Sequence, residues 1–243
     1  MQIVIPCAGE SSRFFIEGYS VIKQLLKIKN KTIIEYVADN FKSPDAKYFF
    51  IFQKKHMEKW YLEIFLALED AKINFEYIEL DHLTDGAVNT ALTVKDRLNP
   101  EEELIIANSD QWVDWNYADF RNKVKDVDGC MPIFIDEKQE NKWSFVSLDE
   151  HNQIQEVRAK DAFTKNAVVG IYYFNKAKDF IKYGQQMIDL NKRVNGEFYV
   201  CPVFNELIAG GKKVISYKVN QMVGLGTPVD FLIAKEYFGE QNN

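Results

Sequence analysis

The residues best suited to bind a phosphate group lie in a turn that directly follows the first apolar run of the chain. The turn reads Ile5-Pro6-Cys7-Ala8-Gly9-Glu10-Ser11-Ser12-Arg13-Phe14. Small residues in such a turn let backbone N–H groups approach phosphate oxygens. Arg13 can give a fork of donors to a phosphate, and Lys23, ten residues later, can close over the same group. One glycine-containing turn alone would be an ordinary strand end, but the turn, Arg13 and Lys23 together predict phosphate binding.

Alternating apolar runs and helix-like stretches must position this turn. Short continuous apolar runs predict buried strands at 2–6, 47–53, 74–80 and 103–107. Helical spacing of apolar residues predicts helices at 31–41, 55–68 and 85–98. Repeated strand-helix units imply a parallel sheet with right-handed crossovers. The turn would then lie at the carboxyl ends of the strands, where open α/β sheets bind their ligands.

The second half of the chain has a different pattern. Short runs at 130–135, 143–148, 154–157 and 168–174 have the spacing of antiparallel strands. Helices are expected at 176–190, 197–209 and 229–238, with a strand at 213–219. We therefore expect an α/β fold with a doubly wound, mostly parallel mixed sheet, and a single domain over residues 1–243.

Composition excludes several classes of protein. With 18 Phe, 12 Tyr and 4 Trp, the chain has too much apolar surface to be disordered. A net charge of −6 argues against a nucleic-acid binder held by charge. Three widely spaced cysteines argue against a disulfide scaffold and suit a reducing compartment. No window approaches the ~20 apolar residues of a membrane span, and no targeting segment is evident. We expect a cytoplasmic protein, and the sequence leaves its oligomeric state open.

The opening turn resembles the start of nucleotidyltransferases with a GT-A-type fold. That group includes sugar-phosphate nucleotidyltransferases and cytidylyltransferases acting on other phosphomonoesters. The family pattern A-G-x-G-[ST]-R, then Lys, then an apolar "gkpii" run, corresponds here to residues 8–13, Lys23 and residues 30–34, with Ser11 at the second glycine. The resemblance implies a Rossmann-like sheet and catalytic roles for Arg13 and Lys23. It also implies a nucleotide-binding turn made of Pro6, Cys7, Ala8, Gly9, Glu10, Ser11 and Ser12.

Two further stretches extend the resemblance on the nucleotide side. Gly86, in the stretch 85–91, matches the glycine that lies against the nucleotide base in the family; Asp85 could equally be a plain helix cap. Asn108-Ser109-Asp110 ends the fourth strand, where the family places a metal-binding aspartate, although such residues are also common in turns. The resemblance implies that Gly86 and Asn108 bind the nucleotide and that Asp110 holds Mg²⁺ or Mn²⁺.

The second half matches the acceptor side of the family. Gly170 lies in a "GiY" strand, Glu197 follows Asn195-Gly196, and Lys160 falls near the lysine of the family's "EKP" triplet. The resemblance implies that these three residues bind the acceptor. Residues 1–120 would form a nucleotide-binding half and residues 121–243 an acceptor-binding half.

One position departs from the family. Residues 224–230 resemble the closing "D-x-G-T-P-x-D", but Gly224 stands where the family often has an aspartate as second metal ligand. Either Asp110 and substrate phosphates hold the ion alone, or another carboxylate such as Asp114 substitutes. Mg²⁺ often needs only one or two carboxylates, because it keeps several waters.

The predicted activity is transfer of a nucleoside monophosphate from a nucleoside triphosphate to a phosphomonoester, with release of pyrophosphate, for capsule or surface-glycan precursors. CTP is favoured because residues 1–243 include no long C-terminal extension of the kind that many sugar-nucleotide enzymes carry. UTP and dTTP are alternatives. A GT-A glycosyltransferase using a nucleotide sugar is the main rival, and Gly224 also leaves open an inactive regulatory protein. A nicotinamide-dependent oxidoreductase is disfavoured because G-x-G-x-x-G is absent. Cys7 is interpreted as a small filler, and Trp112, Trp115 and Tyr117 mainly as packing residues.

Overall fold

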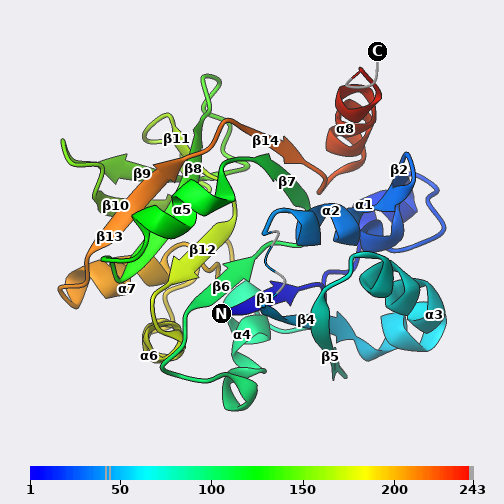
Figure 1. Ribbon diagram of the computed structural model, residues 1–243, viewed down its shortest axis with the longest axis horizontal. Helices are drawn as coiled ribbons and strands as arrows, with labels where there is room; N and C mark the ends of the chain where they lie inside the picture. The colour runs from blue at the N-terminus through cyan, green and yellow to red at the C-terminus, as the bar shows by residue number, and fades with distance from the viewer. Residues whose placement is uncertain (42, 44, 241–243) are drawn as a thin grey trace.

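The computed structural model describes residues 1–41, 43 and 45–240, and a mixed sheet of ten strands runs through it (Figure 1). The strands of this sheet are β1 (Gln2–Pro6), β4 (Lys47–Gln53), β5 (Asn74–Leu80), β6 (Leu104–Ala107), β8 (Gly129–Ile135), β9 (Ser144–Leu148), β10 (Ile154–Ala159), β11 (Asn166–Val168), β12 (Ile171–Phe174) and β13 (Val214–Lys218). Their order is β10-β9-β11-β8-β12-β6-β1-β4-β5, and β13 pairs with β8. One sheet therefore runs through both halves of the chain.

The first half forms the parallel part of the sheet, as the apolar runs predict. β1 lies between β4 and β6 and is parallel to both, so that Val4 aligns with Phe49 on one side and Ile106 on the other. β5 extends the parallel part beyond β4. In the second half, β12 runs antiparallel to β6 and marks the change from parallel to antiparallel pairing.

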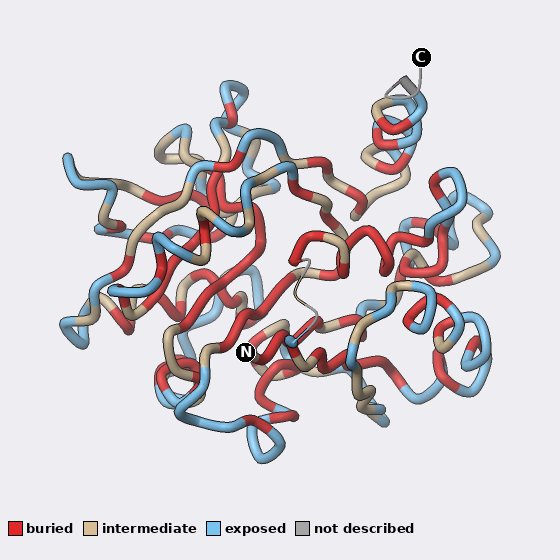
Figure 2. Tube along the Cα trace, in the orientation of Figure 1, coloured by how far each residue is buried: buried red, intermediate tan, exposed pale blue. Residues whose placement is uncertain are grey.

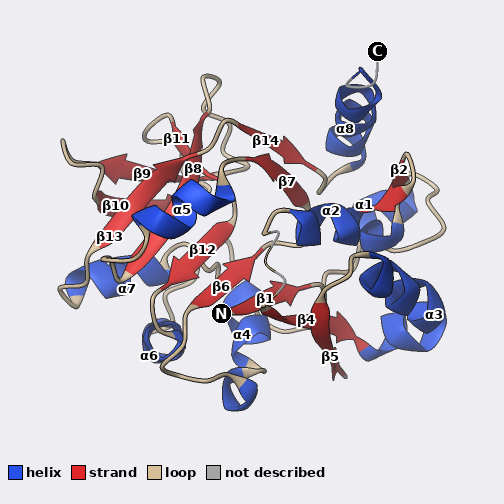
Figure 3. Cartoon of the chain, viewed as in Figure 1, coloured by secondary structure: helices blue, strands red, loops and turns tan. Residues whose placement is uncertain are grey.

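Helices cover both faces of the sheet (Figure 3). The helices packed on one core are α1 (Ser12–Ile16), α2 (Ile33–Asp39), α3 (Lys54–Asp70), α5 (Tyr117–Lys123) and α8 (Pro228–Glu240). The helices packed on the other core are α4 (Ala87–Leu92), α6 (Ala177–Asp189) and α7 (Val203–Ala209). Alternate residues of a strand point to opposite faces, so Ile3 and Ile5 join the first core and Val4 the second.

The central strands are buried from both sides, which explains their continuous apolar sequence (Figure 2). None of the helices in the described ranges is long and apolar enough to cross a membrane.

Two predicted elements are split by glycines. The expected strand at 168–174 divides into β11 and β12 because Gly170 has a φ of 91°, which turns the chain between them. The expected helix at 85–98 begins only at Ala87, because Gly86 has a φ of 129°, and it ends at Leu92 before a short 3₁₀ turn, η2 (Lys95–Arg97). Apart from the helix expected at 197–209, the remaining predicted elements have the expected type, with shifted ends.

The prediction of a helix at 197–209 is wrong for residues 197–202. α7 begins at Val203, and the residues before it bond elsewhere. The Phe198 N–H donates to the Asp85 carbonyl at 2.8 Å, and the Val88 N–H donates to the Phe198 carbonyl at 3.1 Å. Glu197 exchanges backbone hydrogen bonds with Val194. These contacts tie the segment to α4 and keep it out of the helix.

Several short elements were not predicted. They are α1, α5, the 3₁₀ turn η1 (Lys23–Leu25), the hairpin β2 (Lys27–Ile28) with β3 (Lys31–Thr32), and the ribbon of β7 (Gln111–Asp114) with β14 (Gln221–Gly224). The ribbon carries the closing residues 224–230 back beside Asp110, because the Gly224 backbone aligns with Gln111. It thereby joins the end of the chain to the end of β6.

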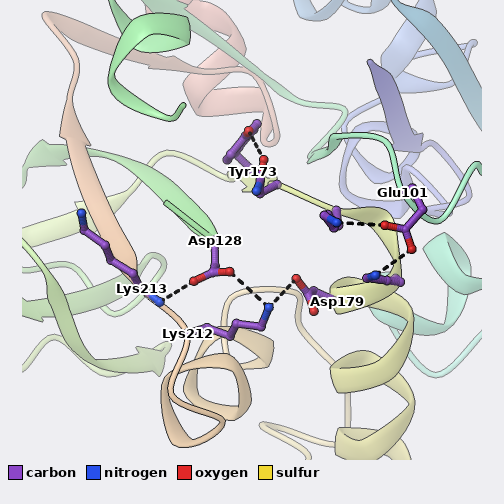
Figure 4. A network of polar contacts seen from close by, with 9 residues as sticks. Glu101, Asp128, Tyr173, Asp179, Lys212 and Lys213 are labelled. Carbon is purple, nitrogen blue, oxygen red and sulfur yellow. Dashed lines mark hydrogen bonds and ion pairs between the residues drawn. The ribbon is translucent and has the colours of Figure 1, made fainter. Parts of the chain in front are cut away.

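A network of ion pairs and hydrogen bonds stabilises the sheet near the amino end of β6 (Figure 4). Lys212 bridges Asp128 and the buried Asp179 of α6, at 3.1 Å to each. The Asp128 carboxylate also accepts the Lys213 N–H at 2.8 Å. Asp128 and Lys213 flank the starts of the paired strands β8 and β13, so the network links this part of the sheet to α6. It lies at the other end of the strands from the phosphate turn.

Candidate active site

A cavity of about 480 Å³ opens at the carboxyl ends of β1 and β6, beside the start of α4. It is lined by Pro6, Ala8, Gly9, Glu10, Lys23, Leu83, Thr84, Gly86, Ala87, Thr90, Asn108, Ser109, Asp110 and Glu197. Most predicted nucleotide-side residues are therefore brought together, with Glu197 from the acceptor side. Sequence reasoning missed Leu83, Thr84, Ala87, Thr90 and Ser109. Thr90 lies one helical turn after Gly86, a spacing that could have pointed to it.

Hydrogen bonds from neighbouring elements fix the backbone of the phosphate turn. The Cys7 N–H donates to the Ile51 carbonyl of β4 at 2.8 Å. The buried Gln24 amide donates to the Cys7 carbonyl at 3.3 Å, and the buried Gln53 amide donates to the Ala8 carbonyl. Because these carbonyls are occupied from behind, the turn has a defined shape at the cavity wall.

Ser11 takes a backbone conformation that usually favours glycine. Its φ is 56°, in the left-handed region, which explains why the family pattern has a glycine here. The Ser11 hydroxyl accepts the Lys23 N–H at 3.0 Å. The side chain that replaces the glycine therefore also anchors the start of η1, which carries Lys23.

Lys23 and Asp110 form an ion pair at the cavity. Lys23 Nζ lies 2.6 Å from Asp110 Oδ2, and the two side chains are 15% and 27% exposed. The pair joins the segment after β1 to the segment after β6. A positive and a negative group are thus both held at the edge of the site, next to the turn suited to phosphate.

Gly86 is required by close packing as well as by its φ. A Cβ at this position would lie 2.6 Å from the Phe198 backbone nitrogen, closer than real Cβ contacts allow. The Phe198 segment can therefore approach the start of α4 only because residue 86 has no side chain. This contact places Glu197, the residue before Phe198, at the same cavity as Gly86.

Asn108 lines the cavity, whereas Gly170 lies behind it. The Asn108 N–H donates to the Gly170 carbonyl at 2.9 Å. A Cβ on Gly170 would lie 2.5 Å from Asn108 Nδ2 and 2.4 Å from Gln111 Nε2. Gly170 is buried and does not line the cavity. It is placed to position Asn108 rather than to touch an acceptor.

The remaining residues of the turn differ in exposure. Cys7 is fully buried beneath the turn, and burial raises the pKa of its thiol to about 12, so it stays protonated at neutral pH. This agrees with a filler rather than a nucleophile. Ser12 and Arg13 begin α1 and are exposed. Neither lines the cavity wall in this structure.

Lys160, one of the predicted acceptor-side residues, lies beside Tyr199. The Lys160 ammonium donates to the Lys142 carbonyl and lies 5.5 Å from the centre of the Tyr199 ring. Burial lowers the pKa of Lys160, and the charges of Asp110, Arg13 and Glu197 also act on it. Lys160 therefore lies within electrostatic reach of the cavity although it does not line it.

The carboxylates near Asp110 decide how a divalent cation could be held. Glycine at 226 leaves room beside Asp110, because a Cβ there would lie 2.8 Å from Asp110 Oδ2. Gly224 supplies no carboxylate, but the Asp230 carboxyl carbon lies 3.4 Å from the position of a Cβ on residue 224. Asp230 is already engaged by the Thr227 hydroxyl at 2.7 Å and by Lys142 at 3.5 Å.

Asp114 does not fill the place of the missing aspartate. It is exposed, and it lines a different cavity, with Trp112 and Trp115. Within the part of the chain that the structure describes, no group of three or more His, Cys, Asp or Glu side chains could hold a metal alone. The donors fit an ion held by Asp110 together with substrate oxygens and water, which Mg²⁺ accepts.

The aromatic residues after Asp110 pack rather than line the site. Trp115 lies 4.7 Å from Phe120 between ring centres, and Trp112 lies 5.2 Å from Phe238. Tyr117 also packs against the first core, and none of the three lines the cavity at Asp110. The prediction that they mainly pack agrees with this geometry.

Solved structures share the fold over almost the whole chain. A nucleoside-diphosphate-sugar pyrophosphorylase from Vibrio cholerae RC9 superposes with a TM-score of 0.81 at 23% identity, covering 96% of this chain and 99% of that one. A UDP-glucose pyrophosphorylase complexed with UDP-glucose gives 0.80 at 14% identity, covering 99% and 98%. A candidate glucose-1-phosphate thymidylyltransferase from Bacillus anthracis, in complex with a sucrose, gives 0.78 at 17%, covering 98% and 94%.

No curated protein matches the chain in a sequence comparison. The family model "Nucleotidyl transferase", in contrast, matches residues 3–236. That range includes the phosphate turn, Lys23, Asp110, Glu197 and the ribbon that returns to Asp110. The predicted family and the predicted α/β fold class are thereby confirmed, and the chain belongs to the nucleotidyl transferase family.

Proposed function

We propose that this protein transfers a nucleoside monophosphate from a nucleoside triphosphate to a phosphomonoester and releases pyrophosphate. CTP is the favoured donor, with UTP and dTTP as alternatives. The observation that carries the proposal is the pairing of Lys23 with Asp110 at 2.6 Å beside the phosphate turn. It places a cation for a triphosphate and a carboxylate for a divalent ion at one cavity.

In the proposed reaction, an oxygen of the acceptor phosphate attacks the α-phosphorus of the triphosphate. The bond to the β-phosphate breaks, and pyrophosphate leaves. The chain supplies position and charge rather than a nucleophile, as is usual for transfer at phosphorus. Lys23 would offset the charge on the phosphate oxygens and on the leaving pyrophosphate. Arg13, exposed at the start of α1, is free to turn toward them.

Asp110 is the residue proposed to hold Mg²⁺ or Mn²⁺, together with phosphate oxygens. A divalent cation bound there would neutralise charge on the triphosphate. Asp110 Oδ2 contacts Lys23 in this structure. When the substrate binds, this ion pair must therefore either open or leave Asp110 in contact with both Lys23 and the metal ion. Lys23 would then move toward the phosphates as Asp110 accepts the ion.

The acceptor is proposed to bind beside Glu197 and within reach of the charge of Lys160. Lys160 would attract its phosphate, and Glu197 would accept hydrogen bonds from its hydroxyl, ammonium or amide groups. A sugar 1-phosphate, a polyol phosphate and a phosphorylated amino acid carry such donors, and phosphocholine offers Glu197 a cation instead. A role in making capsule or surface-glycan precursors rests on the family resemblance.

The test is a matrix of four nucleoside triphosphates against a panel of phosphomonoesters, scored by pyrophosphate release. We expect release only with a matched donor and acceptor, and with CTP ahead of UTP and dTTP. A GT-A glycosyltransferase would release no pyrophosphate from a triphosphate and would consume a nucleotide sugar instead. Failure of every pair to release pyrophosphate would overturn the proposal.

A further inference from the structure

Glu197 lies at the end of a tight backbone turn. Val194 and Glu197 exchange two backbone hydrogen bonds, each 3.0 Å long, which close a two-residue hairpin loop. Both loop residues are in the left-handed region, with a φ of 50° for Asn195 and 83° for Gly196. Asn-Gly is the sequence that this kind of loop prefers, because both of its residues need a positive φ. The turn therefore defines the backbone conformation that leads into Glu197.

The side chain of Arg193, the residue before this turn, folds back onto it. Arg193 Nη1 donates to the Gly196 carbonyl at 2.9 Å, and Nε donates to Asn191 Oδ1 at 2.8 Å. Arg193 Nη2 donates to Asp85 Oδ2 at 2.8 Å. The guanidinium also lies 4.1 Å from the centre of the Phe198 ring. A planar guanidinium can make all these contacts at once, because its donors point in fixed directions and its face stacks on a ring.

Asp85 receives two hydrogen bonds from the segment around Glu197. Its carbonyl accepts the Phe198 N–H at 2.8 Å, and its carboxylate accepts Arg193, which is 108 residues away in the chain. Gly86, which separates Asp85 from α4, lines the cavity. The carboxylate that its place in the sequence offered as a helix cap is thus used by Arg193. The ion pair joins the nucleotide side of the cavity to the turn that carries Glu197.

The exposure of this ion pair indicates which property it controls. The side chains are 34% exposed for Arg193 and 62% for Asp85, and ion pairs at such positions usually contribute little to the free energy of unfolding. The position of Glu197 depends on the pair more directly. Arg193 holds the residue before Glu197, and Asp85 holds the residue after it.

We propose that Arg193 is a positioning residue for the acceptor. It holds the Asn195-Gly196 turn against Asp85 and thereby keeps the Glu197 carboxylate at the cavity. Glu197 lines the cavity and Arg193 does not, so Arg193 acts through Glu197. This inference rests on the proposed function, in which Glu197 binds the phosphomonoester.

The kinetic test is a double-mutant cycle, with the phosphomonoester that gives the most pyrophosphate release in the activity matrix. Arg193→Gln should raise the Michaelis constant for the phosphomonoester about threefold or more, the scale of one lost hydrogen bond. The Michaelis constant for the triphosphate should change by less than about twofold, well below the cost of one lost hydrogen bond. Because Arg193 acts through Glu197, Arg193→Gln should have no further effect in a Glu197→Gln background. Independent, multiplicative effects of the two changes would overturn the inference.

Arg97→Gln is the matched control. Arg97 pairs with Glu76 at 3.4 Å, its side chain is 56% exposed, and it does not line the cavity. Its replacement removes a surface ion pair of the same kind and should leave both Michaelis constants unchanged. Arg193→Lys should give a constant between those of the wild type and Arg193→Gln, because an ammonium keeps the charge but loses the fork of donors. If Arg193→Gln does not fold, Arg193→Lys decides by the same measurements.

Amide hydrogen exchange, followed by mass spectrometry, tests the position of Glu197 without turnover. In Arg193→Gln, the N–H groups of Glu197 and Phe198 should exchange about fivefold faster or more, because local opening of the turn becomes easier. Peptides from α7 should keep their rates. Unchanged exchange at Glu197 and Phe198, or faster exchange with an unchanged acceptor constant, would overturn the inference.

The outcomes separate this inference from the proposed function. Pyrophosphate release that does not respond to Arg193→Gln would leave nucleotidyl transfer standing and remove Arg193 from acceptor positioning. Absence of pyrophosphate release from every pair would overturn the proposed function and, with it, the acceptor role. The exchange measurement would then still decide whether Arg193 holds the turn.

Discussion

Lys23 Nζ lies 2.6 Å from Asp110 Oδ2, although 87 residues separate them in the chain. The contact exists because β1 and β6 are parallel neighbours, so their carboxyl ends meet at one edge of the sheet. The pair is only partly exposed, and each member keeps the other near the phosphate turn. The fold thus holds the two opposite charges that the proposed reaction needs.

Replacing Lys23 by Ala should lower turnover strongly without unfolding the protein. The expected loss is about 2–4 kcal/mol of transition-state stabilisation, the scale of removing one oriented donor. Steady-state kinetics and thermal unfolding would be measured on the same preparation. Lys27→Ala is the matched control, since Lys27 is exposed on β2 and does not line the cavity. Near-normal turnover of folded Lys23→Ala would remove Lys23 from the mechanism.

Asp110→Ala should abolish the Mg²⁺-dependent activity, because the carboxylate proposed to hold the ion at the cavity is lost. Turnover would be followed during a Mg²⁺ titration. Asp114→Ala provides the control: this carboxylate lies nearby in sequence but lines another cavity. It should leave the titration unchanged. Full Mg²⁺-dependent activity in Asp110→Ala would mean that the metal is bound elsewhere.

Glu197→Gln should raise the Michaelis constant for the phosphomonoester more than that for the nucleotide. Gln keeps the size and one acceptor oxygen but loses the charge, so a cationic acceptor should suffer most. A role at a helix N-terminus is excluded, because α7 begins only at Val203. Glu156→Gln, at an exposed position on β10, is the control. Equal shifts in both Michaelis constants would argue against acceptor binding by Glu197.

His56 should make the folded protein sensitive to mild acid. It is 3% exposed, its Nδ1 has no hydrogen-bond partner in the described residues, and burial lowers its pKa below the ordinary 6.5. The unfolded chain therefore binds a proton at higher pH than the folded one, so stability is lost as pH falls from about 6.5 toward the lowered pKa.

The difference in free energy of unfolding between wild type and His56→Phe, measured by urea titration from pH 8 to 5, isolates this effect. The wild type should lose stability relative to the variant by at most about 1.4 kcal/mol per pH unit. His82→Gln, at an exposed position, should run parallel to the wild type. Parallel curves for wild type and His56→Phe would show that His56 does not contribute to the acid sensitivity.

The parts of the site that sequence predicted are those set by local pattern. An apolar strand followed by small residues predicts the turn 6–12. The end of the predicted strand 103–107, together with the family resemblance, predicts Asp110. What could not be predicted depends on contacts between distant segments. The hydrogen bond from Phe198 to Asp85 shortens the helix expected at 197–209. The contact of Thr84 with Thr90 likewise appears only once the backbone turns at Gly86.

Following the two ends of a labelled triphosphate through the reaction tests the central claim most directly. CTP labelled at the α-phosphorus and CTP labelled at the γ-phosphorus would be incubated separately with the protein and the acceptor panel, with Lys23→Ala in parallel. Nucleotidyl transfer predicts the α-label in a joined product with the acceptor and the γ-label in pyrophosphate, with both signals strongly reduced in Lys23→Ala. A γ-label transferred to the acceptor, or an α-label that never leaves the free nucleotides with any triphosphate or acceptor, would contradict the account.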